Sequence, residues 1–176
     1  MKVVCFAGYS GSGKTTLVEG VIGALRLRGL RVSVVKHAHH KFDIDHPGKD
    51  TWRHREAGAF EVVAVSNRRM ALMREFEQET ELTVHQLIAQ LYDGVDWVLV
   101  EGFKSSDLPK IEVWRPESGA ETLYLEDPFI KAIATSVPDQ LRPTTLRPVL
   151  DLNQPQEVLR WMLDNAEDLV YEAPLA

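Results

Sequence analysis

The sequence predicts an α/β fold of three layers, a Rossmann-like sandwich in which a mostly parallel sheet carries helices on both faces and one antiparallel hairpin is added. The alternation of two kinds of sequence pattern predicts this class, and the length predicts the number of domains. Short apolar runs rich in β-formers alternate with stretches in which apolar residues recur at helical spacing. The length, 176 residues, suits one hydrophobic core, so we expect a single domain spanning residues 1–176.

The chain begins with the pattern strand, helix, strand. The run VVCFA at residues 3–7 is too short for a helix, and its composition predicts a strand buried on both faces. From Thr15 to about Arg28, apolar residues recur at helical spacing, and Gly29 suits the end of a helix. A second strand is expected at residues 31–35.

The middle of the chain predicts a loop, a short helix and a hairpin. Residues 36–49 are polar and are expected to form the loop, after which Asp50 can cap a helix that ends near Gly58. Two β-rich runs at residues 61–65 and 70–74 are separated by the polar residues Ser-Asn-Arg-Arg. This arrangement predicts an antiparallel pair.

The remaining residues return to alternating helices and strands. A helical stretch is expected from Thr83, with Gly94 past its end. A final helix is expected at about residues 154–167, where a proline stands near the start. Further strands are expected at residues 97–100, 111–114, 130–134 and 148–150.

Composition excludes several classes of function. The formal charge of -6 disfavours broad binding to DNA or RNA. No segment approaches the roughly 18 consecutive apolar residues that a membrane helix needs. Cys5 is the only cysteine and lies in an apolar run, so we expect a buried thiol and no internal disulfide. These features favour a cytoplasmic protein.

A glycine-rich loop follows the first predicted strand and precedes the first predicted helix. Its sequence GYSGSGKT, Gly8–Thr15, fits the pattern of a phosphate-binding loop, or P-loop, and we call it the phosphate loop. Backbone N–H groups of such a loop surround a polyphosphate at the positive end of the helix. The alternative is a glycine turn that only joins a strand to a helix. The predicted nucleotide-binding residues are Gly8, Ser10, Gly11, Ser12, Gly13, Lys14, Thr15 and Thr16.

Individual side chains around this loop have distinct expected roles. The Lys14 ammonium reaches the β and γ phosphates, the Thr15 hydroxyl binds Mg²⁺, and Thr16 meets the α phosphate. The apolar strand in DWVLVEG ends in Glu101, the expected carboxylate ligand of the metal. Gly102 then allows close approach to the γ phosphate. Lys14 and Glu101 are therefore the predicted catalytic residues of a nucleotide-binding domain.

Asp50 has two expected roles, which are compatible. It can cap the helix that it precedes, or its carboxylate can complete the Mg²⁺ shell with Thr15 and Glu101. Hydrolysis of the nucleotide is expected to be slow, because the sequence has no evident water-positioning glutamine or arginine finger.

Five of the six histidines fall between residues 37 and 54. Three interpretations stay open: a metal site with Asp43 or Asp45 as a further ligand, an anion-binding loop, or a solvated loop without a role. The basic residues around the histidines favour the anion. The candidate residues of this loop are His37, His39, His40, Lys49, Arg53 and Arg55.

With these motifs together, the chain resembles the molybdopterin-guanine dinucleotide biosynthesis protein B family, the adapter-type GTP-binding proteins of molybdenum cofactor assembly. The likeness spans most of the chain. It depends on GYSGSGKTTL, on KHAHHKFDIDHPGKDTWRHREAGA, and on LVEGFK followed by KIEV. The histidine-rich stretch is the specific part, because many families share a phosphate loop.

The resemblance implies a P-loop fold shared with dethiobiotin synthetase, a homodimer, binding of GTP with Mg²⁺, and weak intrinsic GTP hydrolysis. It implies partnership with the guanylyltransferase that joins GMP to molybdopterin. Carried over by position, Gly11 to Thr16 would hold phosphate, and Asp50 and Glu101 would lie on the metal side. The histidine loop would face the phosphate of molybdopterin or of its guanine dinucleotide.

The choice of base stays open between GTP and ATP, because the Asn-Lys-x-Asp guanine reader of many GTPases is absent from the sequence. Asp139, after a predicted strand, is the candidate acceptor for the guanine N–H groups. Two other functions stay open on the same fold: a small-molecule kinase or ligase, and a nickel-type metallochaperone GTPase. The family resemblance favours the adapter.

Overall fold

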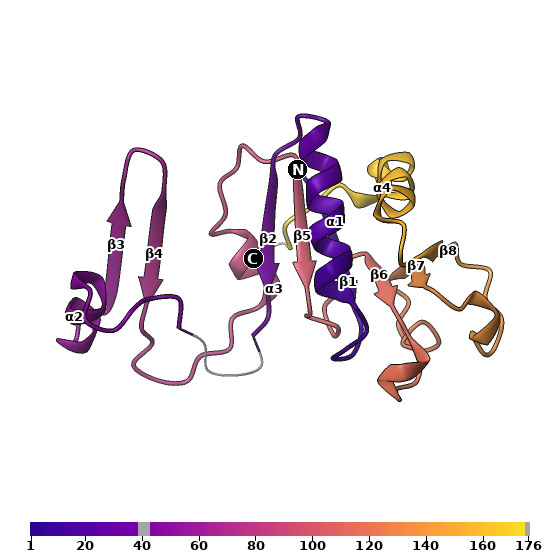
Figure 1. The fold of residues 1–176 in the computed structure, drawn as a ribbon, viewed down its shortest axis with the longest axis horizontal. Coiled ribbons are helices and arrows are strands. Elements are labelled where there is room, and N and C mark those ends of the chain that lie inside the picture. The colour runs from indigo at the N-terminus through magenta and orange to yellow at the C-terminus, as the bar shows by residue number, and fades with distance from the viewer. Residues whose placement is uncertain (39–42, 175–176) are drawn as a thin grey trace. The chain divides into compact units, whose positions relative to one another are not determined.

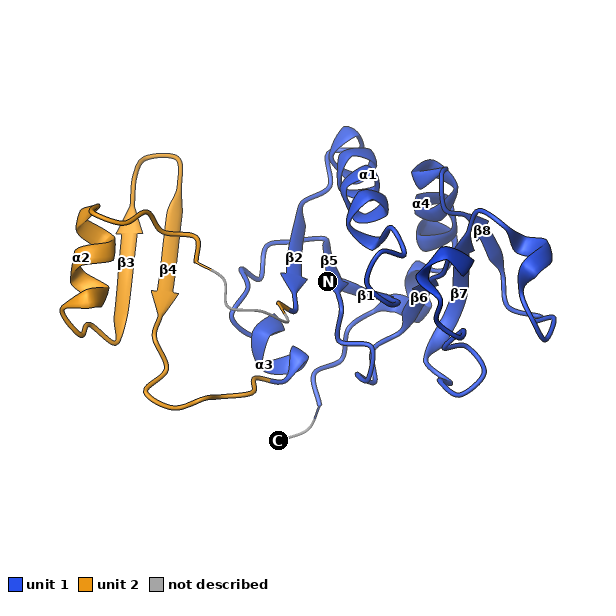
Figure 2. Cartoon of the chain, turned by 60° about the horizontal axis from the view of Figure 1, so that its bottom comes forward, with its two compact units in different colours: residues 1–37, 83–176 blue, residues 38–82 orange. Residues whose placement is uncertain are grey.

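The computed structural model describes residues 1–38 and 43–174, and the chain divides into two compact units (Figure 2). The first unit comprises Met1–His37 and Thr83–Ala176, and the second comprises Ala38–Leu82. The assignment of residues 1–176 to one nucleotide-binding domain stays a prediction.

The first unit contains a six-stranded sheet in the order β2-β5-β1-β6-β7-β8, and every neighbouring pair is parallel (Figure 1). The strands are β1 (Lys2–Ala7), β2 (Val32–Lys36), β5 (Trp97–Glu101), β6 (Lys110–Val113), β7 (Ile130–Thr135) and β8 (Val149–Asp151). The predicted parallel α/β fold is confirmed. Because β1 lies between β5 and β6, the segments that follow these three strands meet at one edge of the sheet.

Helices cover both faces of this sheet. Helices α1 (Lys14–Leu27) and α4 (Pro155–Asp164) pack on the face that Val4 and Phe6 present, and α3 (Val84–Ile88) packs on the face of Val3 and Cys5. The alternation of side chains along β1 therefore supplies both halves of the core. Three short 3₁₀ turns follow strands or helices: η1 (Pro116–Ser118), η2 (Pro138–Gln140) and η3 (Ala166–Leu169).

The second unit consists of α2 (Asp50–Glu56) and the antiparallel pair β3 (Glu61–Val65) and β4 (Met70–Arg74), as the sequence predicted. Four apolar side chains on one face of this pair are exposed, and they form two cross-strand pairs, Val63 with Leu72 and Val65 with Met70. We call these four residues the exposed hairpin face. The residues between them along each strand are partly buried.

Some boundaries differ from the sequence-based expectation. Asp50 does not cap α2, because Lys49 takes the cap position and Asp50 is the first helical residue, where its carboxylate still favours the positive helix end. Helix α3 begins after Thr83, close to the expected start, and Thr83 is its N-cap, with the Thr83 hydroxyl accepting from the Gln86 N–H. Helix α3 nevertheless ends at Ile88, and only Val84 and Ile88 within it are buried.

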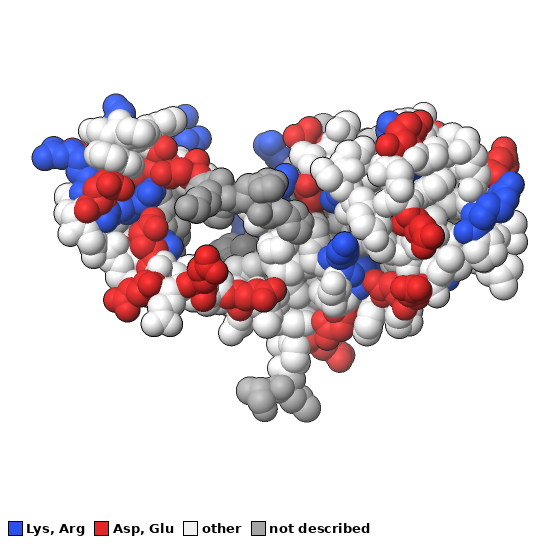
Figure 3. Space-filling view, turned by 90° about the horizontal axis from the view of Figure 1, so that it is seen from below, with Lys and Arg blue, Asp and Glu red and all other residues white. Residues whose placement is uncertain are grey.

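Two large aromatic side chains and the cysteine lie in the core. Trp114 and Tyr124 are buried together in a cluster against β7. Cys5 is fully buried as expected, and burial raises the pKa of its thiol to about 12. None of the described helices combines the length and apolarity needed to cross a bilayer. Acidic and basic side chains are interspersed on the face seen in Figure 3.

The packing of α1 against α4 gives a first prediction. A Cβ at Gly20 would come within 2.5 Å of Pro155 Cγ, whereas a Cβ at Gly23 would meet nothing within 4 Å. Alanine is favoured over glycine inside a helix by about 1 kcal/mol, but overpacking costs about 1–3 kcal/mol. We expect Gly20→Ala to lower the free energy of unfolding by about 1 kcal/mol, and Gly23→Ala to raise it by up to about 1 kcal/mol. Urea denaturation measures both, and equal values would contradict this packing.

Candidate functional site

The phosphate loop joins β1 to α1 at the carboxyl edge of the sheet. A Cβ at Gly8 would lie 2.3 Å from the carbonyl oxygen of Val113, so only glycine lets the loop pass β6 this closely. Gly13 caps α1 in the left-handed conformation, at φ 94°. The first N–H groups of α1 have no partner inside the helix, and this end of the helix therefore favours an anion.

Lys14 is the first residue of α1, and its side chain folds back over the loop. Its ammonium donates to the carbonyl oxygen of Tyr9 at 2.7 Å. Partial burial lowers the pKa of Lys14, an effect that Glu101 opposes and Lys36 reinforces. The ammonium is thus held within the loop by one neutral oxygen, a contact that a phosphate oxygen with a full charge can replace.

Thr15 and Glu101, which are far apart in sequence, meet at this edge. The Thr15 hydroxyl donates to Glu101 Oε1 at 2.7 Å, and the Glu101 side chain is only 10% exposed. The same carboxylate oxygen lies 3.2 Å from the ammonium of Lys36, at the end of β2. A hydroxyl and a carboxylate are the hard oxygen ligands that Mg²⁺ prefers, so these residues fit the expected metal.

The segment after β5 lies close to the residues that follow β2. A Cβ at Gly102 would lie 3.0 Å from His37 Cβ, and Gly102 adopts φ 95°, so glycine is required here. The His37 N–H donates to the carbonyl oxygen of Glu101 at 3.0 Å. The His37 ring lies 4.8 Å from the ring of Phe103. His37 is therefore a neighbour of the candidate metal ligand.

Arg115 lies beside the phosphate loop and is a candidate site residue that the sequence analysis missed. It follows β6, and its Nε lies 3.5 Å from the position that a Cβ of Gly13 would take. One terminal nitrogen donates to Asn153 Oδ1 at 3.4 Å, while Nε is buried without a hydrogen-bond partner among the described residues. Its only signal in the sequence is a charge directly after a strand, and the strand order that makes this charge relevant was not known.

Other predicted nucleotide ligands lie in the same unit. Ser12 is buried, and its hydroxyl has no partner in the described part of the chain. Ser10 and Thr16 are exposed near the start of α1. Asp139 is exposed in η2, in the segment that follows β7, and the carbonyl oxygen of Asp139 accepts from Arg142. The role of Asp139 in reading the base stays a prediction.

The histidine loop belongs largely to the second unit, and His39 and His40 lie outside the described residues. Arg55 is only 13% exposed and forms ion pairs with Asp43 at 2.9 Å, Asp45 at 3.5 Å and Glu75 at 2.8 Å. Its guanidinium holds this unit together, and its predicted role as an anion ligand stays untested. Within residues 1–38 and 43–174, no three His, Cys, Asp or Glu side chains gather as metal ligands would.

Lys49 and Arg53 differ from Arg55 in their exposure. Both are exposed, and Arg53 has only a loose contact with Asp50, at 3.8 Å, with side-chain exposures of 71% and 89%. Such an exposed pair contributes little to stability. Asp50 lies in the second unit, and its predicted place in the metal shell stays a prediction.

Comparison with known proteins identifies the family of the chain. A family model described as molybdopterin guanine dinucleotide synthesis protein B matches residues 3–136, a stretch that contains the phosphate loop, the histidine loop and Glu101. The chain belongs to this family.

Two relatives of the molybdopterin guanine dinucleotide synthesis protein B family carry the name molybdopterin-guanine dinucleotide biosynthesis adapter protein. The chain is 42% identical over 149 residues to that of Haemophilus influenzae, which covers 84% of this chain and 79% of the relative. It is 38% identical over 167 residues to that of Escherichia coli, which covers 91% of this chain and 93% of the relative.

Solved structures of the same family share the fold. A MobB protein homologue from Bacillus stearothermophilus is 26% identical, with a TM-score of 0.71 over 96% of this chain and 99% of that chain. Bacillus subtilis MobB, at 24% identity, has a TM-score of 0.71 over 98% of this chain and 100% of that chain, and shows the fold alone.

Proposed function

We propose that the chain is a GTP-binding adapter of molybdenum cofactor biosynthesis that assists the guanylyltransferase joining GMP to molybdopterin. Family membership supports the pathway. The observation that supports the nucleotide assignment is the 2.7 Å bond between Thr15 and Glu101 beside the phosphate loop, because a neighbouring hydroxyl and carboxylate are the kinds of ligand that hold Mg²⁺ in a phosphate-loop site.

Each site residue has a role in this proposal. The loop amides and Lys14 bind the β and γ phosphates, Thr16 meets the α phosphate, and Thr15 with Glu101 holds Mg²⁺, which neutralises phosphate charge when bound. Asp50 is a further proposed metal ligand. Gly102 leaves room beside the γ phosphate. Remaining nucleotide contacts are assigned to Gly8, Ser10, Gly11, Ser12 and Gly13, with Asp139 as the proposed reader of guanine.

Hydrolysis of GTP by this site is expected to be weak. Glu101 already accepts a hydrogen bond from Thr15 and lies against the ammonium of Lys36, so it is a poor base for a water molecule. The nucleotide then serves as a switch with a slow turnover. This behaviour suits an adapter better than a small-molecule kinase or ligase, the second function that the sequence left open.

The nucleotide assignment is tested at Lys14. Lys14→Ala removes one charge-assisted contact worth about 1.5–3 kcal/mol, so we expect the affinity for GTP with Mg²⁺ to fall by about 10- to 100-fold. Titration calorimetry measures this. Lys131→Ala, which removes an exposed lysine in β7, is the matched control and should bind GTP as the wild type does. Repeating the titration with ATP measures the base preference.

The partnership is tested by capture of the guanylyltransferase. We propose that the exposed cations Lys49 and Arg53, with His37, His39, His40 and Arg55 of the same loop, face the phosphate of the dinucleotide while the guanylyltransferase holds it. The tagged wild-type chain, with GTP and Mg²⁺, should retain purified guanylyltransferase from the same organism. The Lys14→Ala variant should retain a several-fold smaller amount of that enzyme. Retention of equal amounts with and without nucleotide would contradict a nucleotide-controlled adapter.

We also propose a homodimer, and the exposed hairpin face supports it. Four clustered apolar side chains on a two-stranded sheet are a surface that a second copy can cover. Val65→Lys with Leu72→Lys should convert a dimer into a monomer in sedimentation velocity. Leu146→Lys changes a fully exposed single leucine and should leave the mass unchanged. A wild-type chain that sediments as a monomer would exclude the dimer outright.

A further inference from the structure

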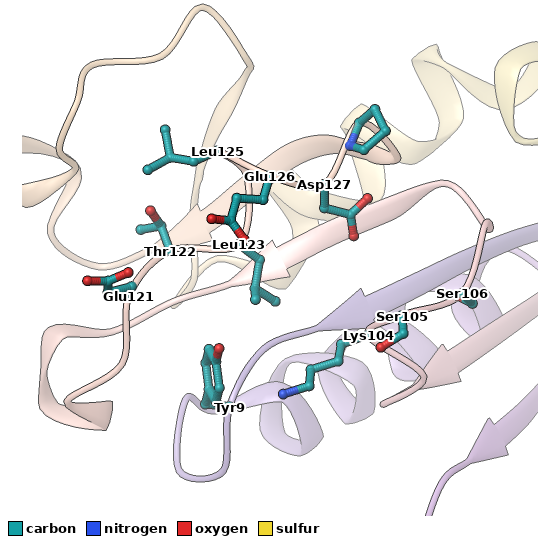
Figure 4. A pocket seen from close by; sticks show the side chains of 11 residues that line it. Tyr9, Lys104, Ser105, Ser106, Glu121, Thr122, Leu123, Leu125, Glu126 and Asp127 are labelled. Atoms are coloured by element: carbon teal, nitrogen blue, oxygen red, sulfur yellow. The ribbon is translucent and has the colours of Figure 1, made fainter.

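A cavity of about 390 Å³ lies in the first unit beside the phosphate loop (Figure 4). Three segments form it: Tyr9 of the phosphate loop, residues 104–106 after β5, and residues 121–128 between β6 and β7. Its volume falls in the range of small-molecule sites, about 300–1,000 Å³. Tyr9 is the one phosphate-loop residue among its lining residues, so the cavity lies next to the phosphate site.

The walls of the cavity are held by two buried charges on β6. The Lys110 side chain is fully buried, and its ammonium contacts Asp127 Oδ2 at 2.9 Å and also donates to the carbonyl oxygen of Ser106. Glu112 is buried as well and accepts from the N–H groups of Leu123 at 2.6 Å and Tyr124 at 2.9 Å. Lys110 therefore ties two of the three walls together, and the cavity is preformed.

One end of the cavity is cationic. The Lys104 ammonium lies 4.5 Å from the ring centroid of Tyr9 and forms no ion pair with a described carboxylate. Figure 4 shows Lys104 directed toward Tyr9, on the side of the phosphate loop. A lysine so placed is a point charge that suits a phosphate group.

The opposite side is acidic. Glu121 and Glu126 are exposed at the cavity, and their carboxylates have no ion pair or hydrogen bond among the described residues, whereas Asp127 is already bound by Lys110 and by the Phe129 N–H. Two free carboxylates accept N–H donors. The cavity thus suits a ligand with an anion at one end and a row of N–H donors at the other.

We infer that this cavity binds the phosphorylated pterin substrate, with its phosphate on Lys104 and the donor edge of its 2-amino-4-oxopyrimidine ring on Glu121 and Glu126. The inference rests on the proposed function, since the family assignment is what brings a pterin to the chain. Guanine carries the same donor edge, so a second guanine nucleotide is the competing source of this chemistry.

The test measures pterin binding to the full chain with its phosphate loop saturated by a non-hydrolysable GTP analogue and Mg²⁺. The probe is neopterin monophosphate, followed by its own fluorescence, with neopterin and GMP titrated in parallel. Lys104→Ala should lower the affinity for neopterin monophosphate about tenfold or more and leave the affinity for neopterin unchanged, because the substitution removes only the phosphate contact. The double variant Glu121→Gln with Glu126→Gln should lower the affinity for both pterins by a similar factor.

Controls separate this inference from the proposed function. Glu167→Gln and Lys131→Ala, both away from the cavity, should bind neopterin monophosphate as the wild type does. Three outcomes would overturn the inference. The first is no binding of neopterin monophosphate at millimolar concentration, and the second is tighter binding of GMP than of neopterin monophosphate. The third is an affinity for neopterin monophosphate that falls in the double variant Lys49→Ala with Arg53→Ala but not in Lys104→Ala. Failure of the proposed function shows differently, as a wild-type chain that does not bind the GTP analogue. If the glutamine variant unfolds, reductive methylation of the wild-type chain replaces it. Bound neopterin monophosphate should protect Lys104 from methylation, and lack of protection would refute the site.

Discussion

The position of β1 between β5 and β6 in a parallel sheet is the constraint on which the site depends. It brings the phosphate loop, Glu101 and Arg115 to one edge, although they are separated by up to about a hundred residues in the chain. Ligands of open α/β sheets bind at the carboxyl ends of the strands for this reason. The bond between Thr15 and Glu101 is the direct product of that strand order.

The buried charges of β6 stabilise the connections around the cavity, whereas the charges of the phosphate site are placed to bind a ligand. Burying Lys110 and Glu112 is costly, and each is compensated by specific partners in the neighbouring segments. Burial raises the pKa of Glu112, which two backbone N–H groups oppose. These contacts give long connections a defined shape without secondary structure of their own.

Local sequence patterns were enough to predict part of the candidate site. The spacing of Gly8, Gly13 and Lys14 specifies the loop by itself, and an apolar run that ends in Glu101 specifies the carboxylate. Arg115 and the pairing of Lys36 with Glu101 depend on strand order, which a single sequence does not display. Asp50 was expected to cap a helix because its carboxylate can do so, yet the preceding Lys49 has the extended backbone of a cap.

Lys110 also has a consequence for communication within the first unit. The Lys110 ammonium contacts two segments: the one after β5, which contains Gly102 and Ser106, and the one before β7, which contains Asp127. A movement of either segment alters the surroundings of the same charge. Thermodynamic linkage then requires reciprocity: if occupancy of one neighbouring site changes affinity at the other, the second must change the first by an equal factor.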